Sequence, residues 1–377
     1  MRILRVAQTY YPDVTGGGAY HVHAMSRDQA AMGHDVTVLT LRRSPDAPRR
    51  EERDGYTVVR RDPTLNVIGN EISAGLVREL WGAKGFDVVH AHSHLYFATN
   101  VAALKRRVGE TPLAITNHGL YSQSAPRWLF DLYLRTLGRA TFDSADVMFC
   151  YTETDERRVR EFGVSADIAI VPNGIDTGRF TPDGPSFDGV AGDPTILFVG
   201  RLVDGKRPTD ALRAFERVYE RHPAARLTFC GDGPLRDQLE REVDECGLDG
   251  AVRFLGHVSY DDMPSVYRAA DVLVLPSESE GFPRTVLEAL ASGTPVVATA
   301  LDQLLPLRDH GVETVPLGDA PAIASAIESL GIEGRDESPD GRSYHQFVAD
   351  QYDWTDTVTE TTDRLVALAE STSSRSE

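Results

Sequence analysis

The sequence predicts an α/β protein built on two doubly wound parallel sheets, and three observations lead to that prediction. Short apolar runs alternate with helical stretches through residues 1–172, which is the pattern of parallel strands joined by crossover helices. The same alternation starts again at about residue 195. The length of 377 residues suits two domains of ordinary size. Ligands of such sheets bind beyond the carboxyl ends of the strands, so functional residues are expected in the loops that follow them.

The first domain, residues 1–172, is expected to begin with a strand at 2–8, a glycine loop and a helix that ends at Gly33. Segment 173–194 is rich in glycine, proline and aspartate and predicts an interdomain linker. The other apolar runs of the first domain predict strands at 35–40, 86–92, 113–118, 146–151 and 168–172, and helices at 97–107 and 126–140.

The second domain is expected over residues 195–353, and a last helix over about 354–370. Because this domain repeats the alternation of the first, it predicts a second doubly wound sheet. Its predicted strands are 195–200, 226–231, 252–256, 271–277 and 295–299, and its predicted helices are 207–221, 234–246, 261–269 and 284–292.

Composition excludes several classes of protein. No run of 18 apolar residues exists, which excludes a transmembrane helix, and the N-terminus lacks the apolar stretch of a signal peptide. The three cysteines (Cys150, Cys230 and Cys246) show no CxxC spacing, so neither a disulfide scaffold nor a zinc ribbon is expected. A cytoplasmic protein is expected, with peripheral contact at the inner membrane face as a further possibility.

Charge narrows the choice of partners. The chain has 57 acidic and 39 basic residues, a net charge of −18, which disfavours a nucleic-acid binder. Only three of the basic residues are lysines, which favours a halophilic host because high salt screens an acidic surface; a genome that favours arginine codons is the alternative. Residues 1–175 carry 21 basic and 20 acidic side chains, whereas residues 176–377 carry 18 and 37, so the two domains are expected to differ in their partners.

The segment 277–297 contains Glu280 and Glu288, eight positions apart, on either side of a predicted helix start at Pro283. The free amides of a helix N-terminus favour a phosphate, and Gly281 allows close backbone approach. Glu280 would stand at the mouth of such a site, and Glu288 on its wall could bind a diol such as ribose. Two acids on a solvated loop and a helix face are the alternative interpretation.

Arg201 directly follows the predicted strand at 195–200, and Lys206 lies five residues later, just before a predicted helix. Such a pair suits a diphosphate, although surface cations are the alternative. The glycine loop 16–18 is similar to a phosphate cradle but matches neither nucleotide-binding fingerprint. Residues 231–234 form another strand-to-helix turn in this prediction, and an ordinary turn without a ligand is the favoured interpretation.

Histidines mark two strand ends of the first domain. His90, His92 and His94 alternate, which would place them on one face, as in a metal site. Because no carboxylate ligand is near, a packed strand end or the lining of a cleft is favoured, and no metal is expected. His118 precedes Gly119 at a sheet edge and is either a core or a catalytic histidine.

Taken in order, these segments resemble the retaining GT-B glycosyltransferases of family 4 (glycosyl transferases group 1). The resemblance covers nearly the whole chain, and the spacing of Glu280 and Glu288 matches the E-x7-E element of that family. The matching segments are YYPDVTGGGAYHV (10–22), GHDVTVLT (33–40), FDVVHAH (86–92), NHG (117–119), VPNGID (171–176), FVGRLVDGKRP (198–208), CGDGP (230–234), AADVLVLPS (269–277) and ESEGFPRTVLEALASGTPVV (278–297).

The resemblance implies two Rossmann-like domains facing each other across a cleft, with the C-terminal helix packing back on the first. It implies that Arg201 and Lys206 hold the diphosphate of a nucleotide-sugar donor and that Glu288 binds the ribose. The donor sugar and distal phosphate would be bound by Glu280 with the backbone of Gly281, Phe282, Pro283 and Arg284. His118 would contact the sugar near the reaction centre, and Gly17 and Gly18 would let the N-terminal loop approach the phosphate and the acceptor.

The implied function is that of a metal-independent hexosyltransferase without a cofactor. It would move a sugar from a UDP- or GDP-linked donor to a hydroxyl acceptor with retention of configuration. A GT-B sugar-nucleotide epimerase or hydrolase and a non-catalytic donor-binding subunit are the alternatives. The acceptor would be a glycan or a lipid-linked molecule, as in the biosynthesis of cell-surface glycans or glycolipids.

The first domain also carries a hint of membrane contact. Seven arginines face four acids in residues 40–61, and the predicted helix at 126–140 carries aromatic and basic side chains. Such features suit an anionic lipid surface, although a solvated loop and a core-packing helix are the alternative. The residues concerned are Arg42, Arg43, Arg49, Arg50, Arg53, Arg60 and Arg61 in the first segment, and Arg127, Trp128, Phe130, Tyr133 and Arg135 in the second.

Overall fold

The computed structural model describes residues 1–14, 16–67, 69–93, 95–120, 127–189, 192–331 and 343–373. The chain divides into two compact units: Met1–Pro172 with Thr355–Glu377, and Asn173–Trp354. Residues 173–194, expected to be a linker, are thus counted with the second unit. Within the described residues, no helix has the length and apolarity that crossing a membrane requires.

The first unit contains an eight-stranded sheet in the order β10-β9-β8-β7-β1-β2-β4-β3. Its neighbouring strands are parallel except at the edge, where β3 and β4 are antiparallel. A separate hairpin joins β5 (Leu65–Val67) to β6 (Asn70–Ile72). The strands of the large sheet are β1 (Arg2–Val6), β2 (Asp35–Leu41), β3 (Arg50–Arg53), β4 (Tyr56–Arg61), β7 (Val88–His92), β8 (Leu113–Thr116), β9 (Val147–Cys150) and β10 (Ile168–Ile170).

Part of the basic segment 40–61, for which no hairpin was predicted, forms the antiparallel hairpin of β3 and β4. Asp54 and Gly55 turn the chain with φ angles of 47° and 84°, and Asp-Gly is the dipeptide that favours this kind of turn. Arg60 is buried because it forms ion pairs with Asp13 at 2.6 Å and Glu51 at 2.8 Å. Strand β4 was missed because its charged residues suggested a solvated loop, whereas Arg60 is neutralised by acids from other elements.

The helix expected at 126–140 is interrupted. The structure has α4 (Arg127–Tyr133), a π-helical turn (Leu134–Gly138) and α5 (Arg139–Phe142). A Cβ on Gly138 would lie 3.1 Å from both the ring and the carbonyl of Tyr133, so a glycine permits this widened turn. The other helices of the first unit are α1 (Gly17–Ala31), α2 (Ala74–Gly82), α3 (Phe97–Val108), α6 (Glu153–Glu161) and, from Thr355 on, α13 (Trp354–Ser373).

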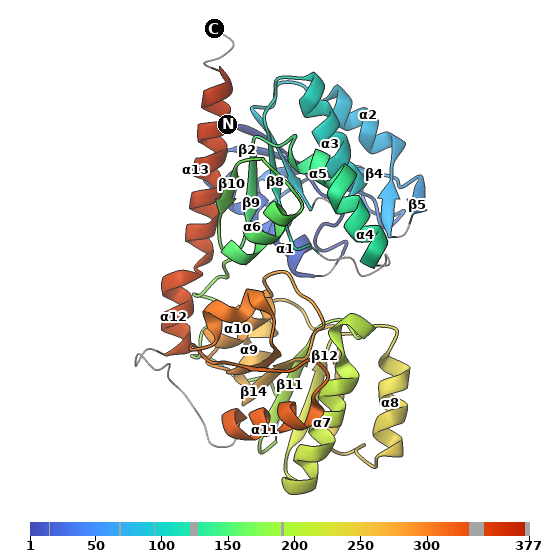
Figure 1. Ribbon diagram of the computed structural model, residues 1–377, viewed down its shortest axis with the longest axis vertical. Helices are drawn as coiled ribbons and strands as arrows, with labels where there is room; N and C mark the ends of the chain where they lie inside the picture. The colour runs from blue at the N-terminus through green and yellow to red at the C-terminus, as the bar shows by residue number, and fades with distance from the viewer. Residues whose placement is uncertain are drawn as a thin grey trace. The chain divides into compact units, whose positions relative to one another are not determined.

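Most of helix α13 belongs to the first unit although it ends the chain (Figure 1). Leu365 is fully buried in a core cluster that includes Ile3 and Val22. The amide of Gln29 also donates to the hydroxyl of Thr362 at 2.9 Å. Burial of an apolar face explains why residues so distant in sequence join this unit.

The second unit contains a six-stranded parallel sheet in the order β13-β12-β11-β14-β15-β16, the order of a doubly wound fold. Its last elements, β16, α11 and α12, were not predicted, although Ser343 and Gln346 form a capping box at the start of α12. The strands are β11 (Thr195–Val199), β12 (Arg226–Cys230), β13 (Val252–Gly256), β14 (Val272–Leu275), β15 (Val296–Thr299) and β16 (Val312–Val315). The helices are η2 (Asp204–Lys206), α7 (Pro208–Arg221), α8 (Arg236–Glu245), α9 (Met263–Arg268), α10 (Arg284–Ala291), η3 (Asp302–Leu307), α11 (Ala320–Gly331) and α12 (Tyr344–Gln351).

Two glycines after β12 have a packing role. A Cβ on Gly231 would lie 2.0 Å from the carbonyl oxygen of Gly200, and one on Gly233 would lie 2.5 Å from that of Leu202. Neither approach leaves room for a side chain. The turn at 231–234 therefore fixes the path of the loop after β11, which carries Arg201 and Lys206.

Candidate functional site

The candidate site of the second unit lies beyond the carboxyl ends of β11 and β14. The loop between β14 and α10 carries Glu280, which is 6% exposed. Lys206 ends the 3-10 turn after β11, and its ammonium donates a hydrogen bond to the carboxylate of Glu280 in an ion pair. The backbone N–H of Glu278 also donates to the carbonyl of Gly205 at 3.0 Å. The backbone thus brings together two predicted residues that are 74 positions apart.

Glu288 lies in α10 and is buried. The hydroxyl of Tyr260 donates to its Oε1 at 3.1 Å, and the hydroxyl of Tyr267 donates to its Oε2 at 2.9 Å. The Arg284 Nε lies 3.7 Å from Oε1. Burial of the phenol, reinforced by the charge of Glu288, holds the pKa of Tyr267 well above its usual range. Tyr267 is therefore a hydrogen-bond donor at any ordinary pH.

The segment 281–284 is buried, and its side chains are used for packing. The ring of Phe282 stacks on Tyr352 with centroids 5.4 Å apart. Arg284 Nη1 donates to the carbonyl of Gly174 at 2.8 Å, and the guanidinium lies over Trp354. Pro283, expected in the first turn of the helix, is its N-cap and has an extended backbone. What this segment can offer a ligand is therefore its backbone at the start of α10.

Arg201 is exposed and follows β11 by two residues. It precedes Lys206 in the same short loop, whose backbone is closed by a hydrogen bond from the N–H of Lys206 to the carbonyl of Val203 at 3.0 Å. Two cations on one loop beside a helix start could bind an anion such as a diphosphate.

The candidate site of the first unit is built from aromatic rings. His118 follows β8, and its Nδ1 lies 2.7 Å from the hydroxyl of Tyr151. Its Nε2 lies 3.0 Å from the Nδ1 of His92, on which its ring stacks. The ring of His21 meets it edge-on with centroids 5.3 Å apart. Burial lowers the pKa of His118 to about 4, so the imidazole is uncharged at neutral pH.

His90 and His92 are packed strand residues. Burial, followed by nearby cationic groups, lowers the pKa of both well below the usual range. The Nη2 of the fully buried Arg5 lies 3.3 Å from the Nδ1 of His90. Because arginine can only donate, that nitrogen accepts, and the Nε2–H of His90 donates to Thr116 at 2.7 Å. His94, the third of the alternating histidines, lies outside the described residues.

The glycine loop lies beside His118. Gly16 has a φ of 142° and caps α1, whose first residues are Gly17 and Gly18. A Cβ on Gly18 would lie 3.8 Å from the Nδ1 of His118, an ordinary contact distance. The structure therefore brings the glycine loop and His118 to one edge of the sheet.

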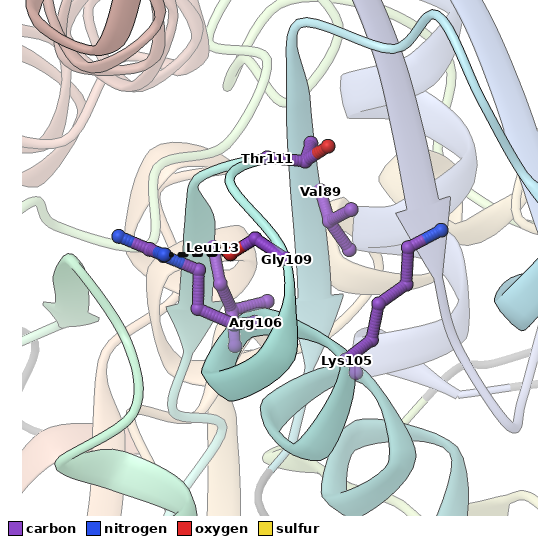
Figure 2. A pocket seen from close by; sticks show the side chains of 7 residues that line it. Val89, Lys105, Arg106, Gly109, Thr111 and Leu113 are labelled. Carbon is purple, nitrogen blue, oxygen red and sulfur yellow. Dashed lines mark hydrogen bonds between the residues drawn. The ribbon is translucent and has the colours of Figure 1, made fainter. Parts of the chain in front are cut away.

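In the described part of the chain, no group of three or more His, Cys, Asp or Glu side chains is arranged to hold a metal ion. A small pocket of about 20 Å³ lies at the other end of β7 and β8 (Figure 2). Its two cations are already engaged: Lys105 donates to the carbonyls of Leu80 and Ala83, and Arg106 to Asp146 and Gly109.

Sequence reasoning missed the residues that surround the predicted ones. Tyr260 and Tyr267 contact Glu288, and Tyr151 contacts His118. No local pattern singles out these tyrosines, because each contact joins elements that are far apart in the chain.

Both halves of the chain match known family models. Residues 15–179 match the model described as Glycosyltransferase Family 4, and residues 187–336 match the one described as Glycosyl transferases group 1. A glycogen synthase of Mycobacterium tuberculosis is 30% identical over 393 residues, covering 96% of this chain and 93% of that protein. A GDP-mannose-dependent alpha-(1-6)-phosphatidylinositol monomannoside mannosyltransferase of Mycolicibacterium smegmatis is 28% identical, covering 85% and 87%.

Solved structures share the fold at lower identity. Sucrose-phosphate synthase from Thermosynechococcus elongatus has a TM-score of 0.79 at 20% identity, covering 98% of this chain and all of that one (100%). Anabaena Alr3699/HepE in complex with UDP-glucose has a TM-score of 0.78 at 18% identity, covering 97% and 100%.

Proposed function

This chain belongs to the GT-B glycosyltransferases of family 4, and from that premise we propose that it transfers a sugar from a UDP- or GDP-linked donor to a hydroxyl acceptor with retention of configuration. The observation that carries the proposal is the joining of Lys206, Glu280 and the start of α10 at one sheet edge, with Glu288 in the same helix. The named relatives support a nucleotide-sugar donor, since one is GDP-mannose-dependent and a neighbour was solved with UDP-glucose.

In the proposed reaction, the bond between the anomeric carbon and the diphosphate breaks, and the acceptor oxygen takes the diphosphate's place on the same face. The acceptor proton passes to the leaving diphosphate. Arg201, Lys206 and the amides at the start of α10 stabilise the negative charge that develops on this leaving group. These cations are side chains, so we propose that neither a metal ion nor a cofactor is required.

The sugar is proposed to be held by Glu280 and the backbone of residues 281–284, with Glu288 binding the ribose. His118 is proposed to contact the donor sugar, and the glycine loop with Gly17 and Gly18 to approach the phosphate and acceptor. Both ring nitrogens of His118 already lie within hydrogen-bond distance of a partner, Tyr151 or His92, so a sugar hydroxyl that bonds to the imidazole has to take the place of one of them.

Turnover of candidate donors tests this function. UDP-glucose and GDP-mannose are incubated with the protein in molar KCl, with and without lipid or glycan extracts, and with excess EDTA. We expect sugar transfer that needs the extract and survives EDTA. Donor isomerisation or hydrolysis without an acceptor would favour the epimerase alternative, and donor binding without turnover would favour a binding subunit. Loss of activity in EDTA with rescue by manganese would refute the metal-free mechanism.

The acceptor is proposed to be a glycan or a lipid-linked molecule, reached by peripheral contact with an anionic membrane at the inner face. Trp128, Leu132 and Leu137 support this contact because their side chains are 69%, 53% and 54% exposed on neighbouring turns. The arginines of residues 40–61 support it less. Each forms an ion pair with an acid of the same unit, with Asp62, Glu71, Glu52, Asp54, Asp13, Glu51 or Glu79 as partner.

A further inference from the structure

The buried carboxylate of Glu288 is surrounded by donors whose arrangement its proposed role leaves unexplained. Two tyrosines from different elements reach it: Tyr267 from α9, and Tyr260 from the loop between β13 and α9. Tyr267 is fully buried, whereas Tyr260 is half-buried. A buried carboxylate is costly unless hydrogen bonds satisfy its oxygens, and these two contacts give each oxygen of Glu288 one donor.

The direction of each hydrogen bond follows from the chemistry of the groups. Arg284 can only donate, and its Nη2 lies 3.2 Å from the hydroxyl oxygen of Tyr260. Tyr260 therefore accepts from Arg284 and donates its own proton to Oε1 of Glu288. Tyr267 donates to Oε2. Each oxygen of the carboxylate is thus held by one tyrosine.

Packing restrains both tyrosine rings. Phe180 meets the rings of Tyr260 and Tyr267 edge-on, with centroids 5.6 and 6.0 Å apart. The guanidinium of Arg179 lies over the ring of Tyr260 at 4.7 Å and is itself paired with Asp261. Rings held in this way offer their hydroxyl groups in fixed directions, which is a property of positioning residues rather than of solvent-exposed polar groups.

A carboxylate accepts about four hydrogen bonds, so two tyrosine donors leave about two positions. A ribose 2′,3′-diol offers two hydroxyl donors, which matches the number of acceptor positions that remain on Glu288. We propose that Tyr267 and Tyr260 are positioning residues for ribose: each holds one oxygen of Glu288 so that the carboxylate presents its remaining acceptor positions to the diol. This inference rests on the proposed role of Glu288 in donor binding.

The test is calorimetric binding of a nucleoside diphosphate with and without the ribose hydroxyls. The probes are UDP and GDP, whichever the wild type binds more tightly, and the 2′,3′-dideoxy form of that nucleotide. We expect Tyr267→Phe and Tyr260→Phe to weaken binding of the ribonucleotide by about tenfold, because a carboxylate that is no longer held in place loses about one charge-assisted hydrogen bond to the ribose. Binding of the dideoxy form should change by less than about twofold, because the analogue makes no hydrogen bond to Glu288.

A matched control is Tyr219→Phe, since Tyr219 lies in α7 and packs against Phe215. It should leave both affinities unchanged. If Tyr267→Phe does not fold, Tyr260→Phe still decides the question, because its ring is half-buried on a loop.

The outcomes separate this inference from the proposed function. If the wild type binds neither UDP nor GDP, or binds the ribose and dideoxy forms equally, the proposed role of Glu288 fails and the inference fails with it. If the wild type prefers the ribonucleotide but the tyrosine variants weaken both forms equally, or weaken neither, the role of Glu288 stands and the positioning role of the tyrosines is refuted.

Discussion

The carboxyl edge of the first sheet presents uncharged rings and glycines, whereas that of the second presents an ion pair and a buried carboxylate. His118 is held by His92 and Tyr151 and has a pKa of about 4. In the second unit, Lys206 pairs with Glu280, and Glu288 is held by two tyrosines. Both sheets are wound in the same manner, so the topology did not decide this difference.

The two units also differ in net charge. The first unit carries 23 basic and 25 acidic side chains, net −2, whereas the second carries 16 and 32, net −16. The unit proposed to bind an anionic donor is thus strongly acidic, and its cations at the site must act locally. We therefore expect local charge at a sheet edge, rather than the net charge of a unit, to govern which ligand that edge takes.

The largest effect is expected for Glu280→Gln. We expect kcat to fall about a hundredfold or more, as for other charged groups at a reaction centre. Affinity for the nucleoside diphosphate should stay the same or rise, because Lys206 loses its carboxylate partner and becomes available to phosphate. Steady-state rates and calorimetry measure both. The matched control is Glu278→Gln, an exposed glutamate on the same loop; a similar loss of kcat in that variant would contradict the assignment.

Glu288→Gln should have the opposite effect, because it should lower nucleotide affinity rather than kcat. A lost charge-assisted hydrogen bond costs about 1.5–3 kcal/mol, so nucleotide affinity should fall about ten- to a hundredfold. We expect kcat at saturating donor to be largely kept, since the ribose is far from the breaking bond. If both glutamate variants lose affinity equally and keep kcat, the division of roles between sugar and ribose is wrong.

As pH falls, the first unit should lose stability at a higher pH than the second. Burial, followed by the charges of Arg53 and Arg27, lowers the pKa of His23 to about 4, whereas an unfolded histidine titrates near 6.5. Between these values the unfolded state binds more protons, so stability is lost as pH falls through this window, by up to about 2 kcal/mol at pH 5 for one such residue. Hydrogen exchange at pH 7 and 5 in constant salt measures the loss in each unit.

A pair of histidine variants sharpens that measurement. His23→Gln should reduce the acid sensitivity of the first unit, whereas His257→Gln, at an exposed histidine of the second unit, should leave it unchanged. Earlier loss of protection in the second unit would show that buried neutral histidines do not govern acid stability here.

Salt should act mainly on the second unit. Because its net charge is −16, we expect molar KCl to raise its unfolding temperature by about 5 °C or more relative to dilute buffer, and to raise activity. The nearly neutral first unit should respond less. Calorimetric scans with a range of KCl concentrations test this, and an activity optimum below about 0.2 M would remove the halophilic interpretation.

The smallest effect is expected for the arginines of the first unit. Replacing Arg42, Arg43, Arg49 and Arg50 with serine should change cosedimentation with anionic vesicles by less than about twofold, because each is already ion-paired. Trp128→Ala with Leu132→Ala should reduce cosedimentation more, since these side chains are exposed. A wild type that binds no vesicle would refute membrane contact.

Several features of this protein could be predicted from the sequence alone. Strand–helix alternation predicted two doubly wound sheets because apolar periodicity is a local property of each element. The helix start predicted at Pro283 likewise placed Glu280 on a loop and Glu288 in α10. The Asp54-Gly55 turn of the β3–β4 hairpin was also present in the sequence, but the surrounding arginines obscured it.

Tertiary structure decided which side chains meet. The pairing of Lys206 with Glu280 depends on β11 and β14 lying side by side, and the contact of Tyr267 with Glu288 depends on how α9 packs beside α10. The buried Arg60 is likewise neutralised by an acid 47 residues away. Such contacts produce no local sequence pattern, because they depend on how whole helices and strands pack together and not on the residues next to each side chain in the chain.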